Sequence, residues 1–158
     1  MERLAPPKTR DRASTPRRAP AGGSAPSSTH GTGPSMVDVF AGVVAAALVV
    51  ATGAIHLHLY TDGYSAVPTI GPLFLANFVV AVVLGIALLA RPRPLWALLG
   101  AGFCLATLAG FLISVHWGLF GYQETLRGAW QARAAVVEVA GAIACTLRAI
   151  RARGAGLA

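Results

Sequence analysis

Charge is what this sequence has least of. Only 12% of its 158 residues are Asp, Glu, Lys or Arg, whereas an ordinary soluble domain carries roughly a quarter. Acidic residues are the scarcest, with 6 of them against 13 basic residues, while 55% of the chain is hydrophobic. This balance excludes an ordinary soluble globular domain and predicts a single membrane-embedded domain.

Cysteine is almost as rare. The 2 cysteines, Cys104 and Cys145, lie inside long apolar segments, and their spacing matches no CxxC or other metal-ligand motif. A zinc-type cysteine cluster is therefore excluded. We interpret both residues as small apolar packing groups, and a disulfide between them stays open as an alternative.

The motifs of soluble catalysis are also missing. The sequence has no GxSxG elbow, no glycine-rich phosphate loop, no HExxH and no paired carboxylates. These absences exclude the commonest hydrolase, nucleotide-binding and zinc-protease sites. We therefore expect that the protein is not an enzyme.

The sequence does contain four long apolar segments, at residues 37–60, 72–90, 95–119 and 130–150. Each has about the length that a helix needs to cross roughly 30 Å of hydrocarbon, which is about 20 residues. Ser35 and Asp38 form a capping-box pattern at the start of the first segment. The sequence thus predicts an all-α fold, a four-transmembrane-helix bundle over residues 35–151.

The two ends of the chain differ from this apolar domain. Residues 1–34 are rich in Pro, Ala, Ser, Gly, Thr and Arg and contain almost no large apolar side chains. A segment of this composition cannot bury enough apolar surface to fold, so we predict a disordered basic tail. Residues 152–158 are predicted to form a second, short tail.

The positions of the basic residues predict an orientation. Eleven of the 13 lie before the first segment, in the second connection or at the end of the last segment, and only Arg127 and Arg133 fall on the other side. Because Lys and Arg accumulate on the cytoplasmic side, both termini are predicted to be cytoplasmic in a multi-pass plasma-membrane protein. The net charge of +7 is then explained by anionic lipid headgroups, and no nucleic acid is expected as a partner.

Small residues recur every four positions along the third segment. Stripes of this kind let helix backbones approach closely in a membrane, where the hydrophobic effect does not drive helix association. We predict a helix contact there, either within the bundle, with a second copy, or with a membrane partner protein. The stripe consists of Gly102, Ala106, Gly110, Ser114 and Gly118.

Four polar side chains, one in each apolar segment, are the candidate functional residues: His56, Asn77, His116 and Glu138. Polar groups at membrane depth are costly and often functional. Counted from the outer ends, all four fall in the outer third of the membrane, so they predict a shallow polar pocket if they face inward. The alternative for each is a structural hydrogen bond, and Glu138 is the hardest to explain in that way because its neighbours are apolar.

Histidines also raise the alternative of a bound metal or haem. Neutral imidazole is a common ligand for both. His56 and His58 are two residues apart, so they point about 200° from each other on a helix and cannot share one ion. One of them could pair with His116, which lies at a similar depth, although no standard motif supports such a site.

The segment 53–77 carries a recognisable pattern: His-Leu-His-Leu-Tyr at 56–60, Gly63-Tyr64, Val67-Pro-Thr-Ile-Gly, Leu73-Phe-Leu and Asn77. A second pattern, Gly-Leu-Phe-Gly-Tyr-Gln-Glu, occupies 118–124. The chain resembles a family of uncharacterised small four-helix membrane proteins of high-GC Gram-positive bacteria, from which it departs at Val67, where Ile is usual. The resemblance implies the fold and the membrane location but no reaction.

Three functions are therefore left open. The first is a structural or partner-binding helical bundle without enzymatic activity. The alternative is a redox protein that holds haem, a metal or a quinone near its outer face. The third is proton-coupled transport of a small solute through Glu138, for which four helices would need to form an oligomer.

Overall fold

The computed structural model describes residues 35–125 and 128–155. The predicted tail 1–34, Arg127 and the last residues of the predicted C-terminal tail lie outside the described residues. All the helices belong to one structural unit, residues 32–158.

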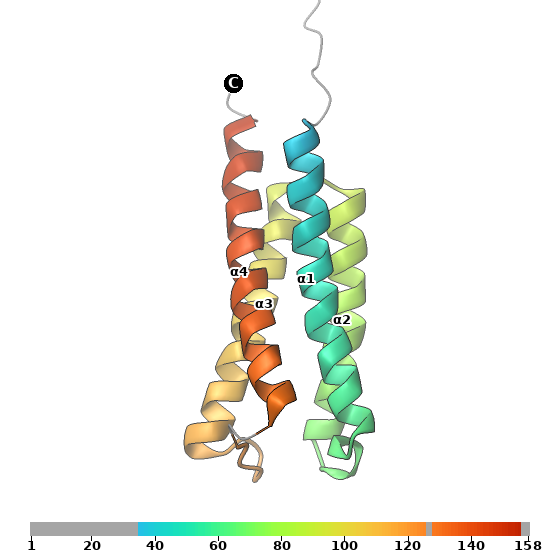
Figure 1. Cartoon of the computed structure of the whole chain (residues 1–158), viewed down its shortest axis with the longest axis vertical. Helices are drawn as coiled ribbons and strands as arrows, with labels where there is room; N and C mark the ends of the chain where they lie inside the picture. Colours follow the sequence, from blue (N-terminus) through green and yellow to red (C-terminus); the bar gives the residue numbers. More distant parts are fainter. Residues whose placement is uncertain (1–34, 126–127, 156–158) are drawn as a thin grey trace, which may run out of the picture. The chain divides into compact units, whose positions relative to one another are not determined.

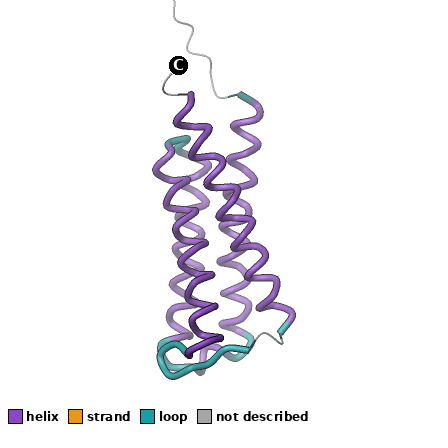
Figure 2. The backbone as a smooth tube through the Cα atoms, turned by 90° about the vertical axis from the view of Figure 1, so that its left-hand side faces the viewer, coloured by secondary structure: helices purple, strands orange, loops and turns teal. Residues whose placement is uncertain are grey.

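Four helices follow one another: α1 (Met36–Thr61), α2 (Ile70–Ala90), α3 (Pro94–Trp117) and α4 (Ala129–Ala155), with a short 3-10 turn, η1 (Tyr64–Ala66), between the first two. They lie side by side as a bundle with alternating directions (Figures 1 and 2). The described residues contain no strand, only an isolated bridge between Leu119 and Tyr122. The predicted all-α class with four helices is confirmed for this part of the chain.

Three of the helices, α1, α2 and α3, are long and apolar enough to cross a membrane, as expected of a multi-pass membrane protein. The fourth is less apolar because Arg133, Glu138 and Arg148 interrupt it, so three of the four predicted spans have the length and hydropathy of a membrane-crossing helix. Helix α4 also continues to Ala155, past the predicted end at residue 150.

The first helix begins as its sequence predicted. Ser35 is the N-cap of α1, and its Oγ accepts a hydrogen bond from the Asp38 backbone N–H at 3.2 Å. The same hydroxyl donates to the Asp38 carboxylate at 2.6 Å. The first bond caps a backbone N–H in the first turn of the helix, and the second links the two side chains of the predicted capping pattern.

Glycine allows α1 and α2 to pack closely. A Cβ atom at Gly53 of α1 would lie 2.5 Å from the Cβ of Ala81 and 3.2 Å from the Cα of Phe78, both on α2. A Cβ at Gly85 of α2 would lie 2.5 Å from a methyl group of Val50 on α1. The two helices therefore lie closer to each other than larger residues at these positions would permit.

Helices α3 and α4 meet through reciprocal glycine–cysteine contacts. A Cβ at Gly100 would lie 2.9 Å from the sulfur of Cys145, and one at Gly141 would lie 2.8 Å from the sulfur of Cys104. Both cysteines are free and buried in the core. They fill the space that the glycines leave open, which is the packing role predicted for them.

The predicted small-residue stripe on α3 lies on a different face. Gly102 and Ala106 are exposed, and a Cβ at Gly102 or Gly110 would meet no atom within 4 Å among the described residues. Ser114 is the buried member of the stripe. Because α2 and α3 make few direct contacts, this face borders a cavity, and packing of the stripe against another chain stays a prediction.

Candidate ligand cavity between helices α2 and α3

A cavity of about 380 Å³ opens where α2 and α3 diverge. Side chains of these two helices form most of its wall, among them Phe74, Phe103 and Phe111. Its floor is polar and comes from α1 and α4, which supply His56 and Glu138. The volume lies within the range of small-molecule pockets, roughly 300–1,000 Å³. We call this space the α2–α3 cavity.

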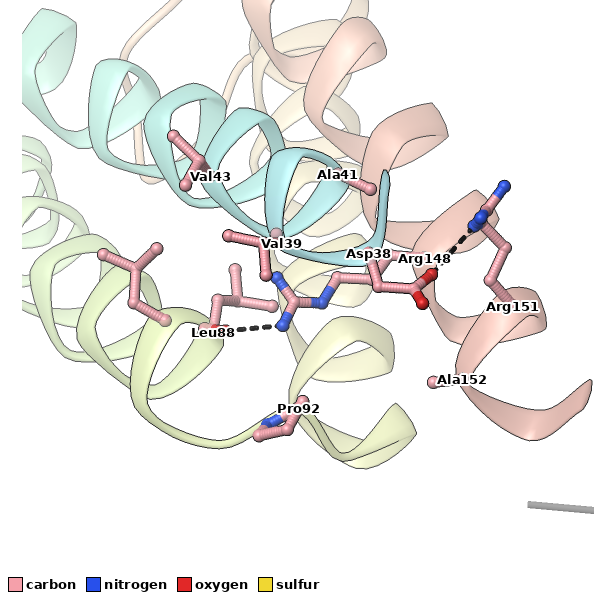
Figure 3. Close-up of a pocket in the computed structure, with 11 residues that line it drawn as sticks. Asp38, Val39, Ala41, Val43, Leu88, Pro92, Arg148, Arg151 and Ala152 are labelled. Carbon is pink, nitrogen blue, oxygen red and sulfur yellow. Dashed lines mark hydrogen bonds and ion pairs between the residues drawn. The ribbon is translucent and has the colours of Figure 1, made fainter. Parts of the chain in front are cut away.

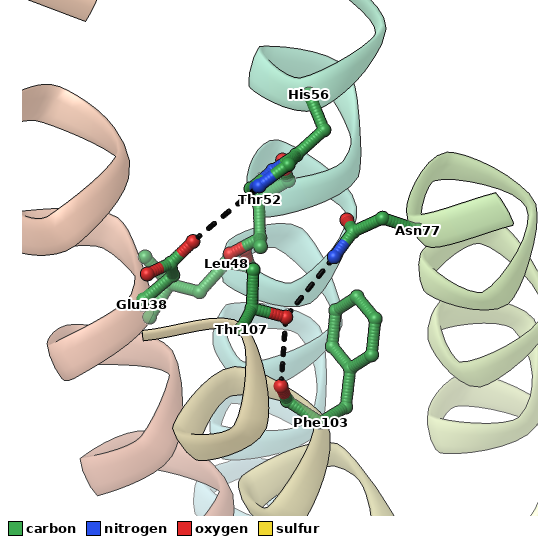
Figure 4. A network of polar contacts seen from close by, with 7 residues as sticks. All are labelled: Leu48, Thr52, His56, Asn77, Phe103, Thr107 and Glu138. Atoms are coloured by element: carbon green, nitrogen blue, oxygen red, sulfur yellow. Dashed lines mark hydrogen bonds and ion pairs between the residues drawn. The ribbon is translucent and has the colours of Figure 1, made fainter. Parts of the chain in front are cut away.

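Glu138 is the most deeply buried polar residue of the cavity, with only 1% of its surface exposed. Its Oε1 lies 3.9 Å from Nε2 of His56 on α1 (Figure 4). That distance is too long for a direct hydrogen bond. The two groups therefore face each other across a gap.

The backbone fixes the tautomer of His56. Its Nδ1 lies 2.9 Å from the carbonyl oxygen of Thr52, and a carbonyl can only accept, so we assign the proton of the neutral ring to Nδ1. Nε2 is then an acceptor that faces Glu138. The ring edge also packs on Phe74, with the centroids 4.9 Å apart.

Asn77 on α2 is oriented by α3. Its Nδ2 donates to Oγ1 of Thr107 at 3.0 Å, and the Thr107 hydroxyl donates to the carbonyl of Phe103 at 2.9 Å (Figure 4). Because that hydroxyl has a single proton, it can only accept from Asn77, which leaves the amide oxygen turned away.

Two residues that line the cavity thus carry a buried, unsatisfied oxygen. Neither Oδ1 of Asn77 nor Oε2 of Glu138 has a hydrogen-bond partner within the described ranges. Burying a polar atom without a partner costs about 1–3 kcal/mol, and each such atom in a native structure needs an explanation. The residues that line the cavity thus carry two acceptors, Oδ1 of Asn77 and Nε2 of His56, and the carboxyl group of Glu138.

A hydrogen-bonded group around Tyr64 includes two residues that line the cavity, Glu124 and Gln131. The Tyr64 hydroxyl of η1 donates to Oε2 of Glu124 at 2.5 Å and accepts from Nε2 of Gln131 at 3.0 Å. Glu124, in the connection after α3, is 8% exposed. The Tyr64 ring stacks on Phe74 at 4.9 Å. Segments from three parts of the chain are therefore held together by this group.

Sequence reasoning missed this group. The only available signal was that Tyr64 and Glu124 lie within the two patterns that carry the family resemblance. Burial and the Glu124 hydrogen bond raise the pKa of the Tyr64 hydroxyl above its ordinary value of 10.

We expect Tyr64→Phe to lower the free energy of unfolding by about 1.5–3 kcal/mol, since it removes a hydrogen bond to a carboxylate. Because the folded-state pKa of Tyr64 is raised, its stabilisation is present below about pH 10 and is lost as the pH rises further. The difference between wild type and variant should therefore shrink above pH 10 in thermal melts. Tyr60→Phe is the control, and an equal loss from both substitutions would contradict the prediction.

The structure brings three of the four predicted site residues to one cavity and leaves the fourth outside it. His56, Asn77 and Glu138 line the α2–α3 cavity, and His116 does not. His116 is exposed, with Nδ1 2.9 Å from the carbonyl of Leu112, because the buried residue at this level of α3 is Ser114. His58 is also exposed and packs against Trp130, with ring centroids 4.3 Å apart.

The metal hypothesis gains no support from this placement. His116 lies outside the cavity that contains His56, so the two histidines do not line a common site. Within the described residues there is also no group of three or more His, Cys, Asp or Glu side chains that could hold an ion. The residues of the cavity are arranged for hydrogen bonding.

Comparisons with protein-family models, with curated proteins and with solved structures gave no match to this chain. The family resemblance of segments 53–77 and 118–124 therefore stays a prediction.

Proposed function

We propose that the protein is a four-span plasma-membrane protein that binds a small lipid-soluble molecule in the α2–α3 cavity. The observation that carries the proposal is that two residues lining this cavity, Asn77 and Glu138, each have a buried oxygen without a hydrogen-bond partner among the described residues. The proposal develops the quinone alternative of the sequence analysis, with the bundle as its scaffold.

A fourth span is supported by the outward face of α4. Between residues 136 and 150 its large exposed side chains are apolar and recur at helical spacing, whereas Glu138 is buried and Arg148 reaches toward α2. A helix that turns its charges inward and its apolar residues outward suits a lipid environment. The exposed apolar residues are Val136, Val139, Ile143, Leu147 and Ile150.

The cytoplasmic assignment of both termini rests on the charge distribution of the sequence. α1 begins and α4 ends at the same end of the bundle, where the α2–α3 connection also lies (Figure 1). This connection carries Arg91 and Arg93, and the last two turns of α4 carry Arg151 and Arg153. Basic residues near one end support that end as cytoplasmic. The α2–α3 cavity then lies toward the outer leaflet.

The chemistry of the cavity indicates the class of ligand. Asn77 Oδ1 and His56 Nε2 can only accept, so the ligand head should donate hydrogen bonds. The phenylalanine-rich wall suits an aromatic ring, and a tail could extend into the bilayer between α2 and α3. A hydroquinone with an isoprenoid tail meets all three requirements, whereas the oxidised quinone offers only acceptors.

The test compares the reduced and oxidised forms of one molecule. Protein in nanodiscs is dialysed against a hydroquinone that carries a single isoprenoid unit and, separately, against its quinone. We expect the hydroquinone to bind at least about tenfold more tightly, which corresponds to about 1.4 kcal/mol. Equal affinity for the two forms, or no binding of either, would overturn the proposal.

Asn77→Leu should weaken hydroquinone binding by about tenfold, since it removes one acceptor. The control is Gln123→Leu, which removes an amide that donates to the Val115 carbonyl and does not line the cavity. Thermal melting of both variants checks the fold, because Asn77 also bonds Thr107. If the two variants bind alike, the assigned role of Asn77 is wrong.

A further inference from the structure

A second cavity, of about 370 Å³, lies at the opposite end of the bundle (Figure 3). It is lined by the first turns of α1, the end of α2 with Pro92, and the last turns of α4. The proposed function does not involve it. We call it the Arg148 cavity after the residue that spans it.

Arg148 extends from α4 past α1 to α2. Its Nη2 donates to the carbonyl oxygen of Leu88 at 2.7 Å (Figure 3). The guanidinium group lies against Gly42 of α1 so closely that a Cβ atom there would overlap with Nη1. Only glycine at position 42 permits this path across the helix.

The charge of Arg148 is not neutralised within the described part of the chain. Its Nη1 is buried and has no hydrogen-bond partner there. The only carboxylate of the cavity lining, Asp38, is 3.3 Å from Arg151 and also accepts from Ser35. Two cations thus face one carboxylate, which leaves the cavity with a positive charge.

The surroundings of this charge are apolar and exposed. Val39 and Val43 of α1 and Leu89 of α2 line the cavity and leave about half or more of their surface uncovered, at 53%, 50% and 60%. A guanidinium group within two turns of a helix end and beside apolar side chains suits a phospholipid. The phosphate would lie at the positive charge, and the acyl chains would lie against the apolar wall.

We propose that the Arg148 cavity binds the phosphate group of an anionic phospholipid. Arg148 and Arg151 supply the positive charge, since guanidinium groups match phosphate oxygens in geometry. The exposed valine and leucine side chains contact the upper part of an acyl chain. Gly42 is a positioning residue, because it permits the guanidinium to lie between α1 and α2.

The test is native mass spectrometry of the full-length protein with phosphatidylglycerol and with phosphatidylcholine. We expect phosphatidylglycerol to be retained preferentially and Arg148→Gln to reduce its retention by about tenfold. The charge-matched control is Arg153→Gln, which removes an exposed arginine of α4 that does not line the cavity. Equal losses from the two substitutions would indicate a general charge effect and overturn the proposal.

Gly42→Ala keeps every charge but displaces the guanidinium group of Arg148. It therefore distinguishes the effect of the position of this group from the effect of its charge. We expect it to reduce retention of phosphatidylglycerol while the thermal melt stays near that of wild type, because the displaced atoms are the end of a flexible side chain. Unchanged retention would contradict the assigned geometry. Excess inorganic phosphate should not displace the lipid, and complete displacement would assign the site to free phosphate instead.

Discussion

Replacing Glu138 with leucine is expected to lower hydroquinone affinity by about tenfold to a hundredfold while the thermal stability of the bundle stays the same or rises. Both effects follow from one feature of Glu138, a carboxyl group that is 1% exposed and has an oxygen without a partner in the described part of the chain. Buried polar groups of this kind are costly to keep. An unsatisfied buried polar group costs about 1–3 kcal/mol, so an apolar residue of similar size should leave the bundle as stable or make it more stable.

The loss of binding has a separate cause. Leucine offers the ligand no hydrogen-bonding group, and a buried ligand donor that is left without its partner costs about 1–3 kcal/mol. A residue that weakens the fold and strengthens binding is the usual signature of a functional site. A purely structural Glu138 predicts the opposite, namely a variant that is destabilised.

The measurement combines equilibrium dialysis in nanodiscs with thermal melts. Glu138→Gln is the conservative variant, and we expect it to retain part of the affinity because its amide still carries an acceptor. Val139→Leu, on the exposed face of α4, serves as the control and should change neither quantity. A Glu138→Leu variant that melts at clearly lower temperature and still binds hydroquinone would remove Glu138 from the proposed site.

The helices of this protein could be predicted because their signal is local. Long apolar segments need only a count of residues, and Ser35 with Asp38 marks the start of α1 in sequence and structure alike. The exception was the membrane character of α4, whose five charged residues lower its hydropathy. Two of them, Glu138 and Arg148, turn toward the other helices, and that orientation is not visible in the sequence.

The candidate site could be predicted only in part, because helix rotation is not a local property. In a helix that is apolar all round, no polar face shows which residues point inward. Depth alone placed His116 with His56, but α3 is rotated so that Ser114 is buried and His116 is exposed. The Tyr64–Glu124 bond joins residues that are 60 positions apart, and no spacing rule links them.

The sequence did not predict the close contact between α1 and α2, because no local pattern marks the two glycines that form it. Gly53 and Gly85 are isolated glycines in a glycine-rich chain and form no regular pattern, whereas the small residues of α3 recur every four positions. Yet the structure places Gly53 against the Ala81 methyl group and the Phe78 backbone. In a membrane such close approach supplies much of the attraction between helices.

Gly53→Val is therefore expected to destabilise the bundle by about 1–3 kcal/mol or more, the usual cost of overpacking a well-packed site. The backbone of Phe78 cannot yield as the end of a side chain would. Gly102→Val is the matched control, since a Cβ there would meet no atom within 4 Å among the described residues. It should melt close to wild type, and equal destabilisation by both variants would show that loss of glycine itself is responsible.

The Gly53→Val substitution should also affect ligand binding. Gly53 and His56 are three positions apart, so they lie on adjacent turns of one face of α1. A valine that pushes α1 away from α2 should also move His56 relative to Glu138, whose facing atoms are 3.9 Å apart. We therefore expect Gly53→Val to weaken hydroquinone binding as well, whereas Gly102→Val leaves it unchanged. Loss of stability with full retention of affinity would mean that the cavity does not depend on the α1–α2 contact.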